Sequence, residues 1–268
     1  MFTDVIAPAT TPATTPRPAA HAAVQPTAVG VDIGGAYTRI WTSGRPLMHA
    51  RSRDRAAGAQ AAVRRGRIAD PAAARSMLAG LFGGYDRPVP PGATVVACRP
   101  VHTNGSDEHA LRQTLADVLA PGRLLFIDSI RAAAIGAGAA PGPLLVVDLG
   151  AQVTEAAVLA GGGVVDAARH EVGLDDVTGP DTEETVVAAV VDLLGRLRRE
   201  RQHRQAVAAA AHGGLLLVGG GANRPRLVAS IAAAVDVPVR RPAAPHLVAV
   251  RGAGLAALAA LRRAVLRG

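Results

Sequence analysis

The sequence contains no lysine, one cysteine and very few aromatic residues. All 29 of its Lys and Arg positions are arginine, which is typical of GC-rich codon usage when alanine and glycine are also abundant. The net charge of +8 therefore favours no function by itself. Aromatic residues make up 2% of the chain, whereas 49% is apolar. The core must be built from Ala, Val and Leu, and we expect helices to meet through small side chains.

The single cysteine, Cys98, excludes an internal disulfide framework and fits a reducing compartment. It lies in the apolar run Ala93–Cys98, where we expect a buried structural thiol. No apolar stretch is long enough to span a bilayer, and the N-terminus lacks the basic start and hydrophobic core of a secretory signal. These absences predict a cytoplasmic protein.

Three arginine clusters, at residues 51–55, 64–67 and 196–204, carry much of the positive charge. Such clusters attract nucleic acid or an anionic membrane surface. None of them is interleaved with aromatic side chains, as a stacking platform for single strands would be. We interpret them as a solvated surface and expect no nucleic-acid partner.

The chain divides into a leader and two halves. Residues 1–26 are rich in Thr, Pro and Ala, and we predict a disordered leader because repeated proline removes backbone donors. The first half covers residues 27–140 and the second 141–268. Hydrophobic periodicity predicts strands and helices in alternation. The expected strands are 28–32, 37–42, 94–98, 124–128, 144–148, 154–159 and 215–218. The expected helices are 71–82, 107–119 with Ser106 as N-cap, 130–139, 182–211, 225–234 and 248–263.

A strand-turn-strand pattern with Asp, Gly and Thr at the same spacing occurs twice. Superposition pairs equivalent residues of the two segments: Asp32 with Asp148, Gly34 with Gly150, and Thr38 with Thr154. A duplicated half-molecule explains this economically, although such hairpins also recur by chance in a glycine-rich chain.

Glycine-rich turns suit phosphate groups because their backbone amides can approach an anion without intervening side chains. A third such turn lies between a strand and a helix, where the amides favour an anion. The candidate nucleotide-binding residues are Gly34, Gly35, Thr38, Gly150, Ala151, Gln152, Thr154, Gly219, Gly220, Gly221 and Ala222. Asp32 and Asp148 suit a Mg²⁺ ion that keeps most of its waters. No P-loop and no Rossmann fingerprint is present.

These three turns, in this order, resemble the superfamily of actin, sugar kinases and DnaK-type chaperones. Four stretches are similar to the bacterial MreB family in particular: residues 66–70, 127–138, 147–172 and 218–222. The resemblance covers roughly residues 28–260. It implies an α/β fold of the actin-like ATPase (RNase H-like) type, with two related halves around a nucleotide cleft.

The resemblance also implies function. ATP and Mg²⁺ are expected in the cleft, with Asp32 and Asp148 near the metal. Asp128 would position the attacking water, so Asp128 and Asp148 are the expected catalytic residues. The family implies self-assembly, or co-assembly with other actin-like filaments, with peripheral membrane contact and a role in cell shape and cell-wall synthesis.

The sequence departs from the family pattern in two ways. The second hairpin, residues 148–154, has Ala151, Gln152 and Val153 where the family has Gly, Gly and Thr, and Asp128 is shorter than the usual Glu. The segments 39–66 and 173–219 are also too short for the family's outer subdomains, which we expect to be largely absent.

Three hypotheses follow. The first is an MreB-like ATPase. The second is a degenerate, non-hydrolysing actin-like module that partners full-length filaments, favoured by the altered hairpin and the short segments. The third, a sugar or acetate kinase, is weaker because these connections leave little room for an acceptor pocket. Fold-level kinship does not decide between them.

Overall fold

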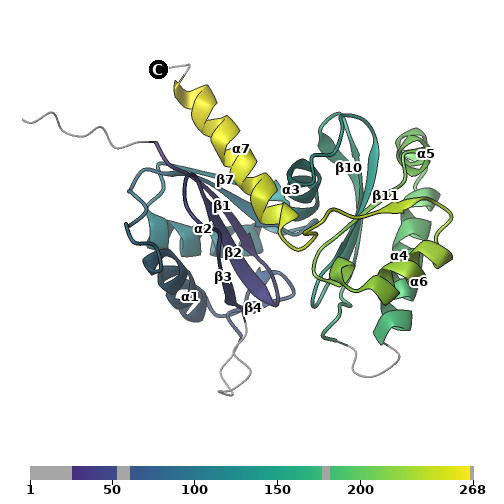
Figure 1. The fold of residues 1–268 in the computed structure, drawn as a ribbon, viewed down its shortest axis with the longest axis horizontal. Coiled ribbons are helices and arrows are strands. Elements are labelled where there is room, and N and C mark those ends of the chain that lie inside the picture. The colour runs from purple at the N-terminus through teal and green to yellow at the C-terminus, as the bar shows by residue number, and fades with distance from the viewer. Residues whose placement is uncertain (1–25, 53–60, 177–181, 266–268) are drawn as a thin grey trace, which may run out of the picture.

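The computed structural model describes residues 26–52, 61–176 and 182–265, which form two domains side by side (Figure 1). Each domain is built on a five-stranded sheet. The first sheet has the order β3-β2-β1-β6-β7, with β1 Ala28–Ile33, β2 Tyr37–Thr42, β3 Met48–Arg51, β6 Thr94–Arg99 and β7 Arg123–Asp128. The second has the order β10-β9-β8-β11-β12, with β8 Leu144–Leu149, β9 Thr154–Ala160, β10 Gly163–His170, β11 Leu215–Val218 and β12 Val239–Arg240.

The two sheets repeat one topology. In each, the first three strands of the domain are antiparallel and the last two join in parallel. The register repeats as well. Asp32 pairs with Arg39 across β1 and β2, and Asp148 pairs with Glu155 across β8 and β9. The prediction of two related halves is therefore confirmed by both strand order and register.

The first domain is covered on one face of its sheet by α1 (Pro71–Gly83) and α2 (Gly105–Leu119). Helix α1 begins at Asp70, whose carboxylate accepts hydrogen bonds from the amides of Ala72 and Ala73, and Pro71 suits the first helical position. The other face is covered by the C-terminal helix α7 (Val248–Val265).

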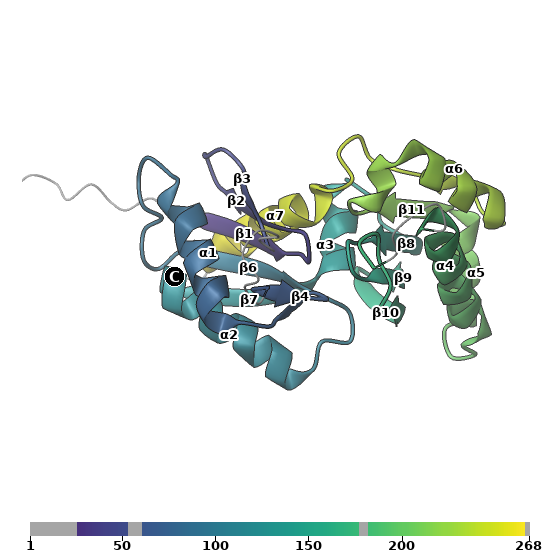
Figure 2. The same cartoon turned by 90° about the horizontal axis from the view of Figure 1, so that it is seen from below.

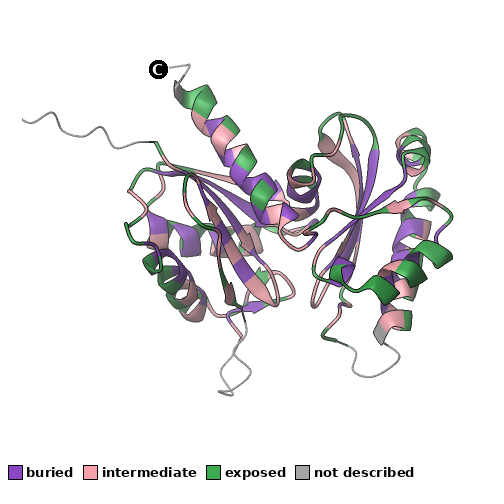
Figure 3. Cartoon of the chain, viewed as in Figure 1, coloured by how far each residue is buried: buried purple, intermediate pink, exposed green. Residues whose placement is uncertain are grey.

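The second domain is covered on one face by α4 (Thr182–Arg199), α5 (Arg204–His212) and α6 (Pro225–Ala234). The other face packs against α3 (Ser129–Gly136). Helix α3 follows the first sheet in sequence but covers the second, whereas α7 follows the second and covers the first. Purple cores in both sheets of Figure 3 show that these layers bury the strands.

Helices α3 and α7 cross in backbone contact between the domains (Figures 1 and 2). A Cβ atom at Gly136 would lie 1.9 Å from the Val248 carbonyl oxygen, and one at Gly252 would lie 1.8 Å from that of Ala132. Only glycine permits this approach. The expectation that helices meet through small residues is confirmed at this crossing.

A small hairpin projects from the first domain towards the second. Its strands, β4 (Val63–Arg64) and β5 (Arg67–Ile68), are joined by Arg65 and Gly66. Both turn residues have positive φ, 52° and 73° respectively, as a type I′ hairpin turn requires.

Two element predictions were wrong. The expected helix 182–211 is two helices, α4 and α5, separated at residues 200–203. The N-cap of α2 is Asn104, which accepts from the Asp107 amide, and Ser106 already lies inside the helix. Unbroken helical periodicity hid the first boundary, and several adjacent capping residues obscured the second.

The short segments expected to lack outer subdomains consist mainly of strands of the two sheets and helices that cover them. The described part of 39–66 supplies β3 and the β4 hairpin strand, and that of 173–219 supplies α4, α5 and β11. The predicted leader, residues 1–26, lies almost entirely outside the described residues, as do Arg53 and Arg55 of the first arginine cluster. None of the described helices is long and apolar enough to cross a bilayer.

The helix crossing generates a stability prediction. Gly252→Ala is expected to lower the free energy of unfolding by roughly 3 kcal/mol, since a methyl group must displace the backbone of α3. Gly80→Ala in α1 is the matched control: its Cβ meets nothing within 4 Å, and helix propensity predicts a gain of about 0.5–1 kcal/mol. Urea denaturation measures both, and equal effects would contradict the close crossing.

Candidate functional site

A cavity with a volume of about 340 Å³ lies between the domains, and we call it the cleft cavity. All three glycine turns predicted from the sequence reach it. Its lining includes Gly34, Gly35 and Ala36 of the first hairpin, Gly150 and Ala151 of the second, and Gly219 and Gly220 after β11, together with Asp32 and Asp148. The volume lies within the range of ~300–1,000 Å³ typical of small-molecule sites.

The two hairpin turns have the same internal geometry. The Gly34 amide donates to the Tyr37 carbonyl at 3.0 Å, and the Gly150 amide donates to the Val153 carbonyl at 2.9 Å. A Cβ atom at either glycine would lie within 3 Å of that same carbonyl oxygen, at 2.9 and 2.7 Å. Both turns therefore require glycine at this position.

Gly219 lies in close contact with the carboxylate of Asp148. Its φ is 85°, and a Cβ atom there would lie 2.1 Å from an Asp148 carboxylate oxygen. The Gly219 amide donates to the Pro245 carbonyl at 3.0 Å, which fixes the loop that precedes α7. The neighbouring Gly220 also lines the cleft cavity and has open space at its Cβ position.

Two carboxylates, one from each domain, form the floor of the cleft cavity. Burial raises the pKa of Asp32, and Arg39, whose guanidinium lies 3.6 Å from that carboxylate, offsets part of this rise. Burial and the charge of Asp32 raise the pKa of Asp148 to about 7. Among the described residues, no hydrogen bond or ion pair is found for the Asp148 carboxylate. Because one guanidinium, that of Arg39, accompanies two carboxylates, the pair is suited to bind a cation.

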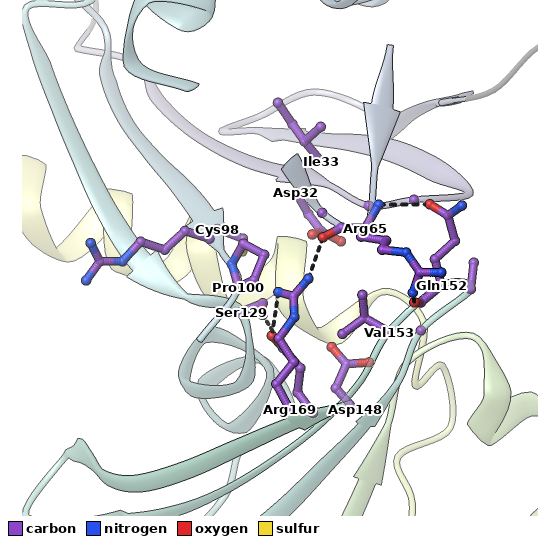
Figure 4. A pocket seen from close by; sticks show the side chains of 17 residues that line it. Asp32, Ile33, Arg65, Cys98, Pro100, Ser129, Asp148, Gln152, Val153 and Arg169 are labelled. Atoms are coloured by element: carbon purple, nitrogen blue, oxygen red, sulfur yellow. Dashed lines mark hydrogen bonds and ion pairs between the residues drawn. The ribbon is translucent and has the colours of Figure 1, made fainter. Parts of the chain in front are cut away.

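A smaller cavity of about 90 Å³, the inner cavity, shares the two carboxylates (Figure 4). It is lined additionally by Cys98, Ser129, Gln152, Glu155 and Arg169. Burial and the nearby carboxylate charges raise the pKa of the Cys98 thiol well above its ordinary value. Cys98 is thus the buried, unreactive thiol expected from the sequence.

Glu155 is the most deeply buried carboxyl group of the site. Its oxygens accept from the Val101 amide at 3.1 Å and the Ser129 hydroxyl at 3.3 Å, and Arg169 lies 3.3 Å away. Burial, followed by the charge of Asp148, raises the pKa of Glu155 to about 8. Because Val101 belongs to the first domain and Glu155 to the second, this group also joins the domains.

Gln152, at the tip of the second hairpin, reaches across to the first domain. Its side-chain oxygen accepts from the Arg65 amide at 3.0 Å and lies 2.8 Å from the Cβ position of Gly35. The side chain that replaces the family's glycine therefore lies between the two hairpin tips. Figure 4 shows the contact between Gln152 and Arg65.

Several predicted site residues do not face either cavity. The Thr38 and Thr154 side chains are fully buried; Thr38 bonds to the Ser52 hydroxyl at 2.9 Å, and Thr154 donates to the Val172 carbonyl at 2.8 Å. The equivalent threonines thus fasten the end of the third strand in each domain. Their hydroxyl groups are not positioned for a ligand.

Asp128 also lines neither cavity. Its carboxylate accepts from Arg99 at 3.2 Å, and the same guanidinium pairs with Glu108. Gly221 and Ala222 are buried behind the third turn, where Gly221 packs against Leu149. The structure therefore brings together Asp32, Asp148, Gly34, Gly35, Gly150, Ala151, Gln152, Gly219 and Gly220, and separates the other predicted residues from them.

Four charged residues of the site were missed in the sequence: Arg39, Arg65, Glu155 and Arg169. The superposition of the two hairpins places Arg39 opposite Glu155, so the repeat contained a signal for these two. Arg65 and Arg169 act across more than 80 residues of chain, and no local pattern indicates such contacts.

The carboxylates of the cleft cavity could hold a metal ion only together with water or ligand oxygens. Among the described residues, no group of three or more His, Cys, Asp or Glu side chains could hold an ion by itself. Mg²⁺ retains several waters and binds through one or two carboxylates plus substrate phosphates. The pair Asp32 and Asp148 fits Mg²⁺ in that mode.

Comparisons with known proteins agree with this fold. The family model described as "MreB/Mbl protein" matches residues 50–182. No match is found among curated proteins.

Three solved structures share the fold. MreB 5 of Spiroplasma citri bound to AMPPNP has a TM-score of 0.77 at 14% identity, covering 91% of this chain and 99% of that one. A MamK double helical filament has a TM-score of 0.68 at 15% identity, covering 89% and 98%. The ethanolamine utilization protein EutJ from Carboxydothermus hydrogenoformans has a TM-score of 0.57 at 20% identity, covering 86% and 89%.

The raised pKa of Glu155 predicts a pH-dependent stability. A carboxyl group whose pKa rises on folding stabilises the protein below its unfolded pKa, and this contribution is lost as the pH rises through about 8. Glu155→Gln removes the titration. From pH 5 to pH 9, the variant should therefore gain roughly 2–4 kcal/mol of unfolding free energy relative to the unaltered protein.

Urea denaturation at several pH values, without added metal, measures this difference. Glu184→Gln on the exposed start of α4 is the control for loss of a surface carboxyl group, and its effect should stay small at every pH. A difference between Glu155→Gln and the unaltered protein that is constant with pH would show that Glu155 is an ordinary ion-pair partner of Arg169.

Proposed function

Because this chain is an MreB-like protein with the actin-like ATPase fold, we propose that it binds ATP with Mg²⁺ in the cleft cavity. One observation carries the proposal: three glycine turns, from both domains, line one cavity that has two carboxylates at its floor. Backbone amides at such turns suit phosphate oxygens. The AMPPNP complex of the similar MreB 5 supports a nucleotide as the ligand.

Different residues of the cleft cavity would contact different parts of the expected ligand. Gly34, Gly35, Gly150 and Ala151 would face the phosphates, and Arg39 would add a positive charge beside them. Asp32 and Asp148 would hold Mg²⁺, which neutralises phosphate charge when it is bound. Gly219 and Gly220, with Arg224 at the same wall, would receive the nucleoside.

We further propose a cytoskeletal role, in which the nucleotide-bound chain assembles with itself or with other actin-like filaments. The similarity to a MamK filament supports assembly. A place in cell-shape control and cell-wall synthesis, with peripheral membrane contact, follows from the MreB resemblance and belongs to the same proposal. Sedimentation with and without ATP tests assembly, and a chain that stays monomeric at every concentration would contradict it.

Gly220→Leu tests the nucleotide site. The Cβ position of Gly220 meets no atom within 4 Å, so the variant should fold while its side chain projects into the space for the ligand. ATP affinity is expected to fall at least about tenfold by calorimetry. Gly80→Leu, also in open space but on α1, is the matched control and should bind normally.

A second arm addresses the metal. Asp148→Asn should remove most of the gain in ATP affinity that Mg²⁺ gives the unaltered protein, because one of two carboxylate ligands is lost. Absence of ATP binding in the unaltered protein, with and without Mg²⁺, would overturn the proposed function altogether.

A non-hydrolysing actin-like module is the second candidate, and the position of Asp128 favours it. The carboxyl group expected to position water is held by Arg99 and lines neither cavity. The two candidates differ in turnover. The ATPase hypothesis expects phosphate release that Asp128→Asn abolishes, whereas the module hypothesis expects weak ATP binding or none, and no phosphate release from either protein.

A further inference from the structure

The tip of the β4–β5 hairpin makes contacts with the second domain through every polar part of Arg65. The Arg65 amide donates to the Gln152 side chain at 3.0 Å. Its carbonyl accepts from Arg169 at 2.7 Å. Its guanidinium donates to the Gln152 carbonyl at 3.2 Å, to the Glu171 carbonyl, and to the Asp176 carboxylate at 3.1 Å.

The backbone of the hairpin is shaped for these contacts. Arg65 has a φ of 52°, a conformation that side chains other than Gly, Asn and Asp rarely adopt. The following residue, Gly66, has no room for a side chain, since its Cβ position lies 2.7 Å from Pro100. The turn is therefore fixed against its own domain while it presents Arg65 to the other.

The domains are also joined by the crossing of α3 and α7, by the Val101 amide, which donates to Glu155, and by His102, whose ring lies 3.0 Å from the Ala167 carbonyl oxygen. The β4 hairpin lies away from that crossing, towards the bottom of Figure 1. A rotation about the helix crossing would separate Arg65 from Gln152 and open the space between the two hairpin tips. Contacts far from a pivot oppose such a rotation most effectively.

We infer that Arg65 and Gln152 form a clasp that holds the two domains together over the cleft cavity. All contacts of the clasp are made between groups of the protein itself. The clasp also bonds to Arg169, which pairs with Glu155 inside the inner cavity. In a chain that binds nucleotide as proposed above, opening the clasp would limit nucleotide exchange.

Individual half-exposed ion pairs contribute little, but Arg65 combines backbone and side-chain bonds in one rigid turn. Gln152 adds a contact that the glycine of the family pattern could not make. The sequence departure that weakens the second phosphate turn thus supplies half of the clasp.

Interdomain distance in the nucleotide-free protein tests the inference. Spin labels at Ala79→Cys on α1 and Ala233→Cys on α6 occupy exposed positions, while Cys98 is buried. Pulsed EPR should give one narrow distance distribution for the otherwise unaltered chain. Arg65→Ala and Gln152→Ala should each broaden it or shift it. Arg64→Ala, in the same hairpin but exposed, is the matched control and should leave it narrow.

Exchange kinetics provide the second measurement. Release of a fluorescent ATP analogue should be at least about tenfold faster in Arg65→Ala than in Arg64→Ala, as expected when an open state is populated more often. Unchanged distance distributions in both clasp variants would overturn the clasp. So would a distribution that is broad in the unaltered protein and narrows only with ATP.

The experiments distinguish a failure of the proposed nucleotide binding from a failure of the proposed clasp. The EPR comparison uses no nucleotide, so a chain that does not bind ATP can still show a clasp. A chain that binds ATP, and loses binding in Gly220→Leu, can still lack one.

Discussion

The crossing of α3 and α7 is the constraint on which the rest of the structure depends. Each helix follows one sheet in sequence and covers the other, so the two domains share their covering layers. Each helix can cover the sheet of the other domain only because Gly136 and Gly252 let the two helix backbones come into contact. Bulkier residues would separate the helices, and the two hairpins would no longer approach each other across the cleft cavity.

The site is formed by two similar hairpins, one in each domain, and sequence differences between these hairpins make its two sides unequal. Both hairpins keep the same turn hydrogen bond and the same buried threonine. At the register position after that threonine, one copy has Arg39 and the other Glu155. Arg39, beside Asp32, offsets part of the rise that burial causes in the pKa of that carboxyl group. Asp148 has Glu155 at the equivalent register position, and burial together with the charge of Asp32 raises its pKa to about 7.

The inner side of the cleft is a continuous polar network rather than an open space. Ser129 and Val101 bond to Glu155, Glu155 pairs with Arg169, and Arg169 bonds to the backbone of Arg65. Buried carboxylates are costly unless they are bonded and paired. The bonds that stabilise buried Glu155 therefore come from both domains.

Most strands, the two hairpins, the third glycine turn and the carboxylates Asp32 and Asp148 were predictable from the sequence, because they follow from local periodicity and from a repeat of fixed spacing. The fold class was implied by the resemblance of these turns to those of actin-like proteins. Three features emerged only in the folded chain: Asp128 is held by Arg99, Thr38 and Thr154 face inwards, and Arg65 contacts Gln152. Those outcomes depend on contacts between residues far apart in the chain, and the direction of a side chain there is set by packing and burial, which no local pattern records.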